Sequence, residues 1–273
     1  MREGDLRMLS TLVGGAVLAS LLALGAGAAA AEDRPADLLA KKLAEFPGAD
    51  RGQVIAVTEP SLTAAFSSFH FFVLRFRQYP VAVMPAGPLD ANNLFVVKPD
   101  ASVEPIRDTR ALESFFRAAL TPVTEAGQAK DAARAWLRLV QEFHQDGFFQ
   151  FSIPEDSLHV SSGPSGRLQV TGRVVVTPQG GNAGEIDASL IFDTAGRLVK
   201  ASATPSLKRG IRPRCQATKL LDPDPIVRGM AEEALLVLGK AAKEYLEEQR
   251  ARANPELRQA IDRIWQRILS EDR

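Results

Sequence analysis

Residues 168–192, LQVTGRVVVTPQGGNAGEIDASLIF, carry the clearest structural pattern of the chain. Apolar residues occupy alternate positions in two runs of this stretch. They are Leu168, Val170, Val174 and Val176 in the first run and Ile186, Ala188, Leu190 and Phe192 in the second. Successive side chains of a strand point to opposite faces, so each run indicates a strand with one buried face. The glycine-rich residues 179–184 join the two strands as a turn.

The neighbouring residues extend this pair into a sheet. Residues 193–196, Asp-Thr-Ala-Gly, predict a turn into a third strand over 197–203, and residues 148–153 and 158–160 predict strands ahead of the pair. Consecutive strands joined by short turns indicate an antiparallel meander.

Helices are predicted before the meander. The longer one, over residues 124–144, places one set of residues on a single face: Ala129, Ala132, Ala133, Trp136, Val140 and Phe143. That pattern is typical of a helix lying across a sheet. A shorter helix, with Leu112, Phe115, Phe116 and Ala119 in one row, follows a candidate N-cap at Asp108 or Thr109.

The residues before these helices predict a further helix over 36–46 and strand-like runs at 70–77, 94–97 and 102–106. In the first run Phe72, Leu74 and Phe76 share a face, and Pro99-Asp100 is the expected turn of a hairpin. The fold class is therefore α+β: a long helix on an antiparallel meander, followed by a small all-α segment.

A long helix followed by antiparallel strands resembles the cystatin-like cup in its topology. Residues 53–57, Gln-Val-Ile-Ala-Val, look like the inhibitory hairpin of that family. The last glycine of the hairpin is absent, however, and the segment precedes the long helix, so no inhibitor function is carried over.

After residue 204 the chain becomes rich in proline and arginine, and beyond Asp222 only helices are predicted. The first begins after Asp224-Pro225 and ends at Gly239, the second covers 240–251, and the third begins after Asn254-Pro255. The apolar residues of the first helix repeat at intervals of four, as Ile226, Met230, Ala234 and Leu238, with Val227, Ala231 and Leu235 alongside. Those of the other two are Ala242, Tyr245 and Leu246, then Leu257, Ile261, Ile264, Trp265, Ile268 and Leu269.

Residues 221–228, Leu-Asp-Pro-Asp-Pro-Ile-Val-Arg, together with the apolar positions that follow them, resemble a HEAT-type helical repeat. Such families bind proteins through stacked helix pairs, and the motif carries no catalytic residues. One repeat does not bury its own face, because stability in these arrays comes from neighbouring repeats. The expected domains are therefore a signal peptide at 1–31, an α+β domain at 32–214 and a HEAT-like segment at 215–273, which docks on its own chain or on another protein.

The first 31 residues predict export. Arg2 and Arg7 precede an uncharged, strongly apolar run that ends in small residues at 25–31, as a signal peptidase requires. We expect cleavage after Ala31 or a residue or two earlier, and a periplasmic or extracellular location. The alternative is an uncleaved N-terminal membrane anchor, since the run is long enough to cross a bilayer of roughly 30 Å.

The composition of the chain limits the classes of partner that the sequence favours. The chain has 33 basic and 33 acidic residues, so no charge excess favours a nucleic acid. The single cysteine, Cys215, has no partner for an internal disulfide, which leaves a partly buried inert thiol or coupling to another chain.

Motifs for chemistry are weak. The histidines are His70, His144 and His159, and Glu142, His144 and Asp146 alternate near a helix end, where side chains two apart diverge. Residues 163–166 and 180–184 are glycine-containing turns, without the helix that a catalytic serine or a phosphate site requires. No catalytic, cofactor-binding or metal-ligating residue is predicted.

Two features have competing interpretations. The basic run at 208–214 is either a solvated linker or a contact for an acidic partner or lipid headgroups. The aromatic residues Phe148, Phe149 and Phe151 are either core or the lining of a ligand cup.

The function expected first is a non-catalytic protein-interaction or scaffold protein of the cell envelope, with another protein as its partner. The alternatives are a cup that binds a small molecule or lipid, and an enzyme with scattered catalytic groups, which one sequence never excludes.

Overall fold

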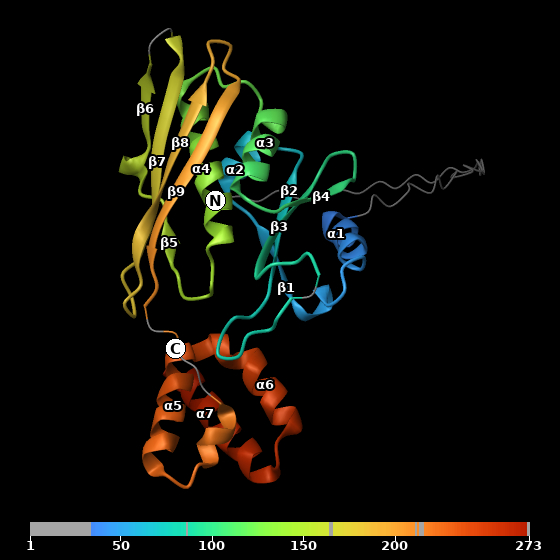
Figure 1. Ribbon diagram of the computed structural model, residues 1–273, viewed down its shortest axis with the longest axis vertical. Helices are drawn as coiled ribbons and strands as arrows, with labels where there is room; N and C mark the ends of the chain where they lie inside the picture. Colours follow the sequence, from blue (N-terminus) through green and yellow to red (C-terminus); the bar gives the residue numbers. More distant parts are fainter. Residues whose placement is uncertain (1–33, 86, 164–165, 211, 213–215, 272–273) are drawn as a thin grey trace, which may run out of the picture. The chain divides into compact units, whose positions relative to one another are not determined.

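The computed structural model describes residues 34–271 except 86, 164–165, 211 and 213–215. The expected signal segment, Cys215 and the boundary at residue 214 therefore lie outside the described residues. The fold is mixed α+β, with antiparallel sheets and C-terminal helices, as predicted (Figure 1).

The residues 168–192 form two adjacent strands of a five-stranded antiparallel sheet, called sheet B. Its strands are β5 (Phe151–Ser152), β6 (His159–Ser162), β7 (Leu168–Val176), β8 (Ala183–Phe192) and β9 (Leu198–Lys208). Strands β5 and β6 both pair with β7, on the side that β8 does not occupy, and a short 3-10 helix, η2 (Glu155–Ser157), separates them. The antiparallel meander is confirmed for β6 to β9, whereas β5 pairs with β7 and not with β6.

Strand β9 is longer than the sequence predicts. It continues to Lys208 and keeps its pairing with β8 across Pro205, which lies opposite Ile186. Proline lacks the N–H of a ladder hydrogen bond, but an edge strand such as β9 needs its donors on one side only. The third strand therefore extends beyond its predicted end at residue 203.

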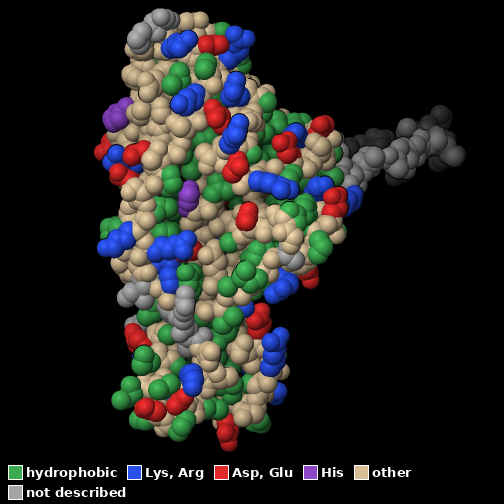
Figure 2. Space-filling model, viewed as in Figure 1, with side chains coloured by type: hydrophobic (Ala, Val, Ile, Leu, Met, Phe, Trp, Pro, Cys, Tyr) green, Lys and Arg blue, Asp and Glu red, His purple; other side chains and the backbone are tan. Residues whose placement is uncertain are grey.

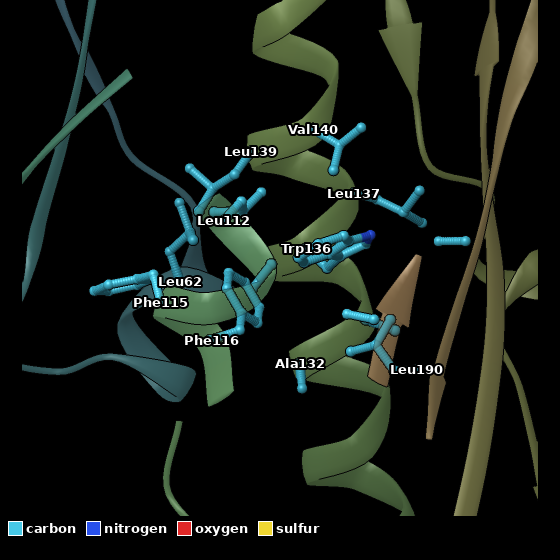
Figure 3. Packing of buried hydrophobic residues seen from close by; sticks show 14 of the residues in the cluster. Leu62, Leu112, Phe115, Phe116, Ala132, Trp136, Leu137, Leu139, Val140 and Leu190 are labelled. Carbon is cyan, nitrogen blue, oxygen red and sulfur yellow. The ribbon is translucent and has the colours of Figure 1, made fainter. Parts of the chain in front are cut away.

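Helix α4 (Ala126–Phe143) is the centre of the structure. It packs on β7 and β8 with one side and reaches strand β3 of a second sheet with the other. In Figure 3, Leu137 extends from α4 toward sheet B, and Leu139 lies on the opposite side near Leu112. Gly172 of β7 permits this close approach, because a Cβ atom there would lie 3.1 Å from Leu137 Cδ1 and 2.6 Å from Leu158 Cδ2.

Two shorter helices complete this core. Helix α3 (Thr109–Ala119) begins where Asp108 Oδ1 accepts a hydrogen bond from Ala111 N at 2.7 Å, which selects Asp108 as the N-cap. Helix α2 (Pro60–Ala65) packs on α4 and is followed by Phe66. The ring of Phe116 meets Trp136 edge to face, with 5.1 Å between ring centroids, so the three helices share one aromatic cluster.

The second sheet, sheet A, has both faces buried. Its strands run in the order β1 (Gln53–Val57), β2 (His70–Arg75), β3 (Asn92–Val97) and β4 (Val103–Ile106). One face, with Phe71 and Val73, joins the core around α4; the other, with Phe72 and Leu74, forms a smaller cluster with helix α1 (Pro35–Leu43). A 3-10 turn, η1 (Ala49–Arg51), connects α1 to β1. The hairpin predicted at Pro99-Asp100 joins β3 and β4.

The C-terminal helices contain a separate buried cluster. They are η4 (Ala217–Leu221), α5 (Pro225–Leu238), η5 (Gly239–Ala242), α6 (Lys243–Arg252) and α7 (Pro255–Ser270). We call residues 216–271 the helical tail. Among the helices that the structure describes, none has the length and apolar character needed to cross a membrane.

Candidate interaction surface

Helix α5 forms where the sequence predicts it, because both of its ends are specified locally. Asp224 Oδ1 accepts a hydrogen bond from Ile226 N at 2.8 Å, and Pro225 occupies the first helical position. Gly239, with a φ of 56°, ends the helix in a conformation that other residues adopt only with strain.

One side of α5 is buried within the helical tail. Ala231, Leu235 and Leu238 pack with residues of the other tail helices, among them Tyr245, Ile261 and Ile268. The hydroxyl of Tyr245 accepts a hydrogen bond from Ala217 N at 2.7 Å, which fastens η4 to α6.

The other side of α5 exposes apolar side chains to solvent. Ile226 is 72% exposed, Met230 69% and Val237 51%. At about 100° per residue these three positions lie within about 40° of one line along the helix, so they form a single row that we call the outer stripe. Of the residues that repeat at intervals of four in the sequence, Ile226 and Met230 are thus exposed. The buried residues of α5 come mainly from the adjacent row, which contains Ala231 and Leu235.

An acidic residue interrupts the outer stripe. At about 100° per residue Glu233 falls in the same row, exposed between Met230 and Val237. Glu232 lies on another side of α5, where Arg267 of α7 approaches it to 3.9 Å. Arg267 also donates to Glu271 at 2.7 Å, and this hydrogen bond raises the pKa of the Arg267 guanidinium. Figure 2 shows hydrophobic side chains at the surface of the helical tail with acidic and basic ones among them.

The helical tail contacts the α+β part through charged and aromatic groups. Arg77 donates to Glu248 of α6 at 3.0 Å, and its guanidinium lies 5.7 Å from the ring centroid of Tyr245. Tyr79 and Phe148 pack against the buried cluster of the tail, with their rings edge to face at 5.5 Å. The tail thus docks on its own chain, one of the two options expected for it.

A cleft of about 640 Å³ lies beside these contacts. Its lining includes Arg75, Arg77, Asp146 and Glu248, each of which is bound in an ion pair. These four charged groups of the cleft therefore take part in ion pairs of the structure itself.

The acidic residues considered for a metal take structural positions. Glu142 is buried and accepts from Arg75 at 2.6 Å and from Arg138 one turn away on α4. Asp146 is buried and accepts from Arg212 at 2.7 Å. Among the described residues, no group of three or more His, Cys, Asp or Glu side chains is placed to hold a metal ion.

The histidines lie apart. His70 and His159 are exposed at strand ends. His144 follows α4 and is half-buried, and this burial lowers the pKa of its imidazole because the charged form loses hydration. His144 lines an open cleft with Arg107 and Arg209, but not with the other histidines.

The glycine-rich turn and the basic run meet in space. Asn182, in the β7–β8 turn, is buried; its side chain donates to Phe148 O at 3.0 Å and accepts from Gly210 N at 3.1 Å. Gly210 approaches Gly180 so closely that a Cβ atom would lie 2.0 Å from the carbonyl oxygen of Gly180. The segment is a turn between β7 and β8, as the sequence predicts, and it also supports the chain after β9.

Arg212 shows that the basic run is only partly a solvated linker. Its guanidinium is buried against Asp146 and lies 4.9 Å from the ring centroid of Phe148 and 5.1 Å from that of Phe149. Phe149 is itself buried, and Phe151 packs on the core around α4. The core interpretation of these aromatic residues is thus the one that the structure supports.

Sequence reasoning missed the link between Arg75 and Glu142, which lie on different elements and 67 positions apart. The spacing of Arg138 and Glu142, four apart on α4, was the only local signal. Comparison of the chain with protein-family models, curated proteins and solved structures finds no match.

Proposed function

We propose that the chain is an exported, non-catalytic interaction or scaffold protein of the cell envelope, and that its helical tail binds another protein through the outer stripe. The observation that carries the proposal is the row Ile226, Met230 and Val237, exposed on a helix whose opposite side is already buried. Exposed apolar side chains grouped on one helix face mark a candidate protein-binding site.

The HEAT-like pattern of the tail supports the same proposal. Families with such repeats present helix faces to protein partners, and stacking of further helices covers their apolar surface. In this chain the inner side of α5 is covered by the tail's own helices, so a partner is needed only for the outer stripe.

The alternative of a ligand-binding cup has less support. The space between α4 and sheet B is filled by large buried side chains, among them Trp136, Leu137 and Leu190 (Figure 3). A lipid site needs an apolar cavity, whereas the cleft of about 640 Å³ has ion-paired groups in its lining.

The proposal is tested by crosslinking and affinity capture from intact cells, with the full-length chain tagged at its C-terminus. The bait is compared with the double variant Ile226→Asp/Met230→Asp, and Met84→Asp is the matched control, because Met84 is 72% exposed and lies outside the tail. We expect one specific envelope protein with the wild type and the control, and its loss with the double variant. Equal capture by all three baits contradicts the proposal.

A thermal unfolding curve of each variant accompanies the capture experiment. The three side chains are exposed, so their replacement leaves the fold unchanged. Loss of capture with an unchanged unfolding temperature then reports on binding alone.

A further inference from the structure

The two sheets have edge strands that differ in how well they are protected against pairing with another chain. An edge strand presents unpaired N–H and C=O groups, and proteins commonly block it with charged residues, proline or an interruption. Such features occur on β4, on β9 and on the edge formed by β5 and β6. They are Glu104 and Pro105 on β4, Lys200, Pro205 and Lys208 on β9, and Glu155 and Asp156 in the turn between β5 and β6.

Strand β1 lacks all of these features. Its sequence, Gln-Val-Ile-Ala-Val at 53–57, contains no charge and no proline, and Val54 is 45% exposed. Strand β2 pairs with β1 along its whole length on one side, and no described strand pairs with the other side. Helix α1 packs over β3 and β4, which lie farther from this edge.

The residues that flank β1 are charged and complementary. Arg51 precedes the strand and Glu59 follows it, and neither has an ion-pair partner within the part of the chain that the structure describes. The backbone is extended at Gly52 and again at Glu59, whereas Arg51 is the last residue of η1. The charged side chain of Arg51 therefore lies just beyond the end of the extended segment.

These positions are symmetric about Ile55. If two copies of β1 pair antiparallel with Ile55 opposite Ile55, each residue faces the one equally far on the other side of the centre. Val54 then faces Ala56 of the second copy. The side chain of Arg51, just outside the extended segment, comes near Glu59 of the second copy at both ends of the pair. The register therefore places apolar residues together in the middle and opposite charges at the two ends.

We propose that the free edge of β1 pairs with β1 of a second copy of this chain in that register. The arrangement is isologous, since the same surface serves both partners, and it joins the two four-stranded sheets into one continuous antiparallel sheet. Two five-residue strands bury little area, so the dimer is weak and reversible. The proposal is independent of the function assigned to the helical tail.

The register is tested with single cysteines in the full-length chain, in a Cys215→Ser background. Opposite residues of an antiparallel pair have Cα atoms about 4.5–5.5 Å apart, within the range of a disulfide. We therefore expect Ile55→Cys to form disulfide-linked dimers on mild oxidation in intact cells. Val54→Cys is the matched control: it is the more exposed position, but its two copies are diagonal neighbours about 7–8 Å apart and should crosslink at least several-fold less.

Charge exchange provides a second readout on the Ile55→Cys chain. Arg51→Glu and Glu59→Arg each place like charges opposite one another and should reduce the crosslinked dimer several-fold, while the double variant Arg51→Glu/Glu59→Arg restores it. Circular dichroism of each variant confirms that the fold is kept.

Three outcomes overturn the proposal. The first is equal crosslinking at positions 54 and 55, which indicates that the chains meet by random collision and not in the proposed strand register. The second is a double charge variant that stays as weak as the single ones. The third is a disulfide from Ile55→Cys to a different protein, which makes β1 the site of a foreign peptide.

Discussion

Helices α4 and α5 are both rich in apolar residues, yet they use them differently. Helix α4 lies between two sheets and has buried residues on successive positions, such as Ala135, Trp136 and Leu137. Helix α5 buries one side in the tail and leaves Ile226 and Met230 largely exposed. An apolar face contributes to stability only where the chain covers it, so the uncovered face of α5 is available for a partner.

The largest expected effect is at the centre of α4. Trp136 is fully buried, and Trp136→Ala should lower the free energy of unfolding by about 3–5 kcal/mol, because the cavity it leaves is poorly refilled. Trp265 of α7 is only partly buried, and Trp265→Ala should cost about 1 kcal/mol. Urea unfolding followed by circular dichroism measures the free energy of unfolding of both variants. Equal losses from the two substitutions would contradict the difference in burial between the two tryptophans.

The next effect concerns the ion pair between Asp146 and Arg212. Both side chains are buried, so Asp146→Asn leaves an uncompensated charge and should cost about 3 kcal/mol. The exposed pair of Arg250 and Asp262 is the control, and Asp262→Asn should change stability little because water screens it. Chemical unfolding at neutral pH distinguishes the two, and a small loss for Asp146→Asn means that the pair does not fasten the chain after β9.

A smaller effect depends on pH. Burial lowers the pKa of His144 in the folded state below its unfolded value of 6.5, so the unfolded chain binds a proton more readily as the pH falls. This residue therefore costs no stability above that unfolded pKa, and its penalty grows as the pH drops from there to the folded pKa. The free energy of unfolding of the wild type and of His144→Gln is measured from pH 7.5 to 5.5, and it should fall less steeply with pH in the variant. An equal pH dependence in the two proteins contradicts a lowered pKa of His144 in the folded state.

The smallest effect should be at the outer stripe. Met230→Ala should change the free energy of unfolding by less than about 0.5 kcal/mol, because its side chain is already in water. Leu235→Ala, on the buried side of the same helix, should cost about 2–4 kcal/mol. A large loss at Met230 means that the stripe is covered within the chain.

Elements with complete local signals were predictable from sequence. The caps at Asp108 and Asp224, the glycine after α5 and the alternation in β7 and β8 all agree with the structure. Helix α2 was missed because it has six residues, too few for a helical period to show. Strand β9 was cut short because Pro205 is a poor strand residue unless the strand is known to be an edge.

The candidate surface was only half predictable. The periodicity of α5 shows two adjacent apolar rows, and a sequence pattern does not say which row the chain buries. That depends on where α6 and α7 pack, which is a property of the tertiary structure. The ion pairs of Glu142 and Asp146 were not predictable from local sequence, because their partners Arg75 and Arg212 come from distant parts of the chain.

In the proposed function, the outer stripe contacts another protein in the cell. The most direct measurement places a photo-crosslinking amino acid at Met230 in the full-length chain and irradiates intact cells, with the same substitution at Met84 as the control of equal exposure. We expect one discrete crosslinked protein from position 230 and none from position 84. No crosslink at either position, or the same set of crosslinks from both, contradicts it.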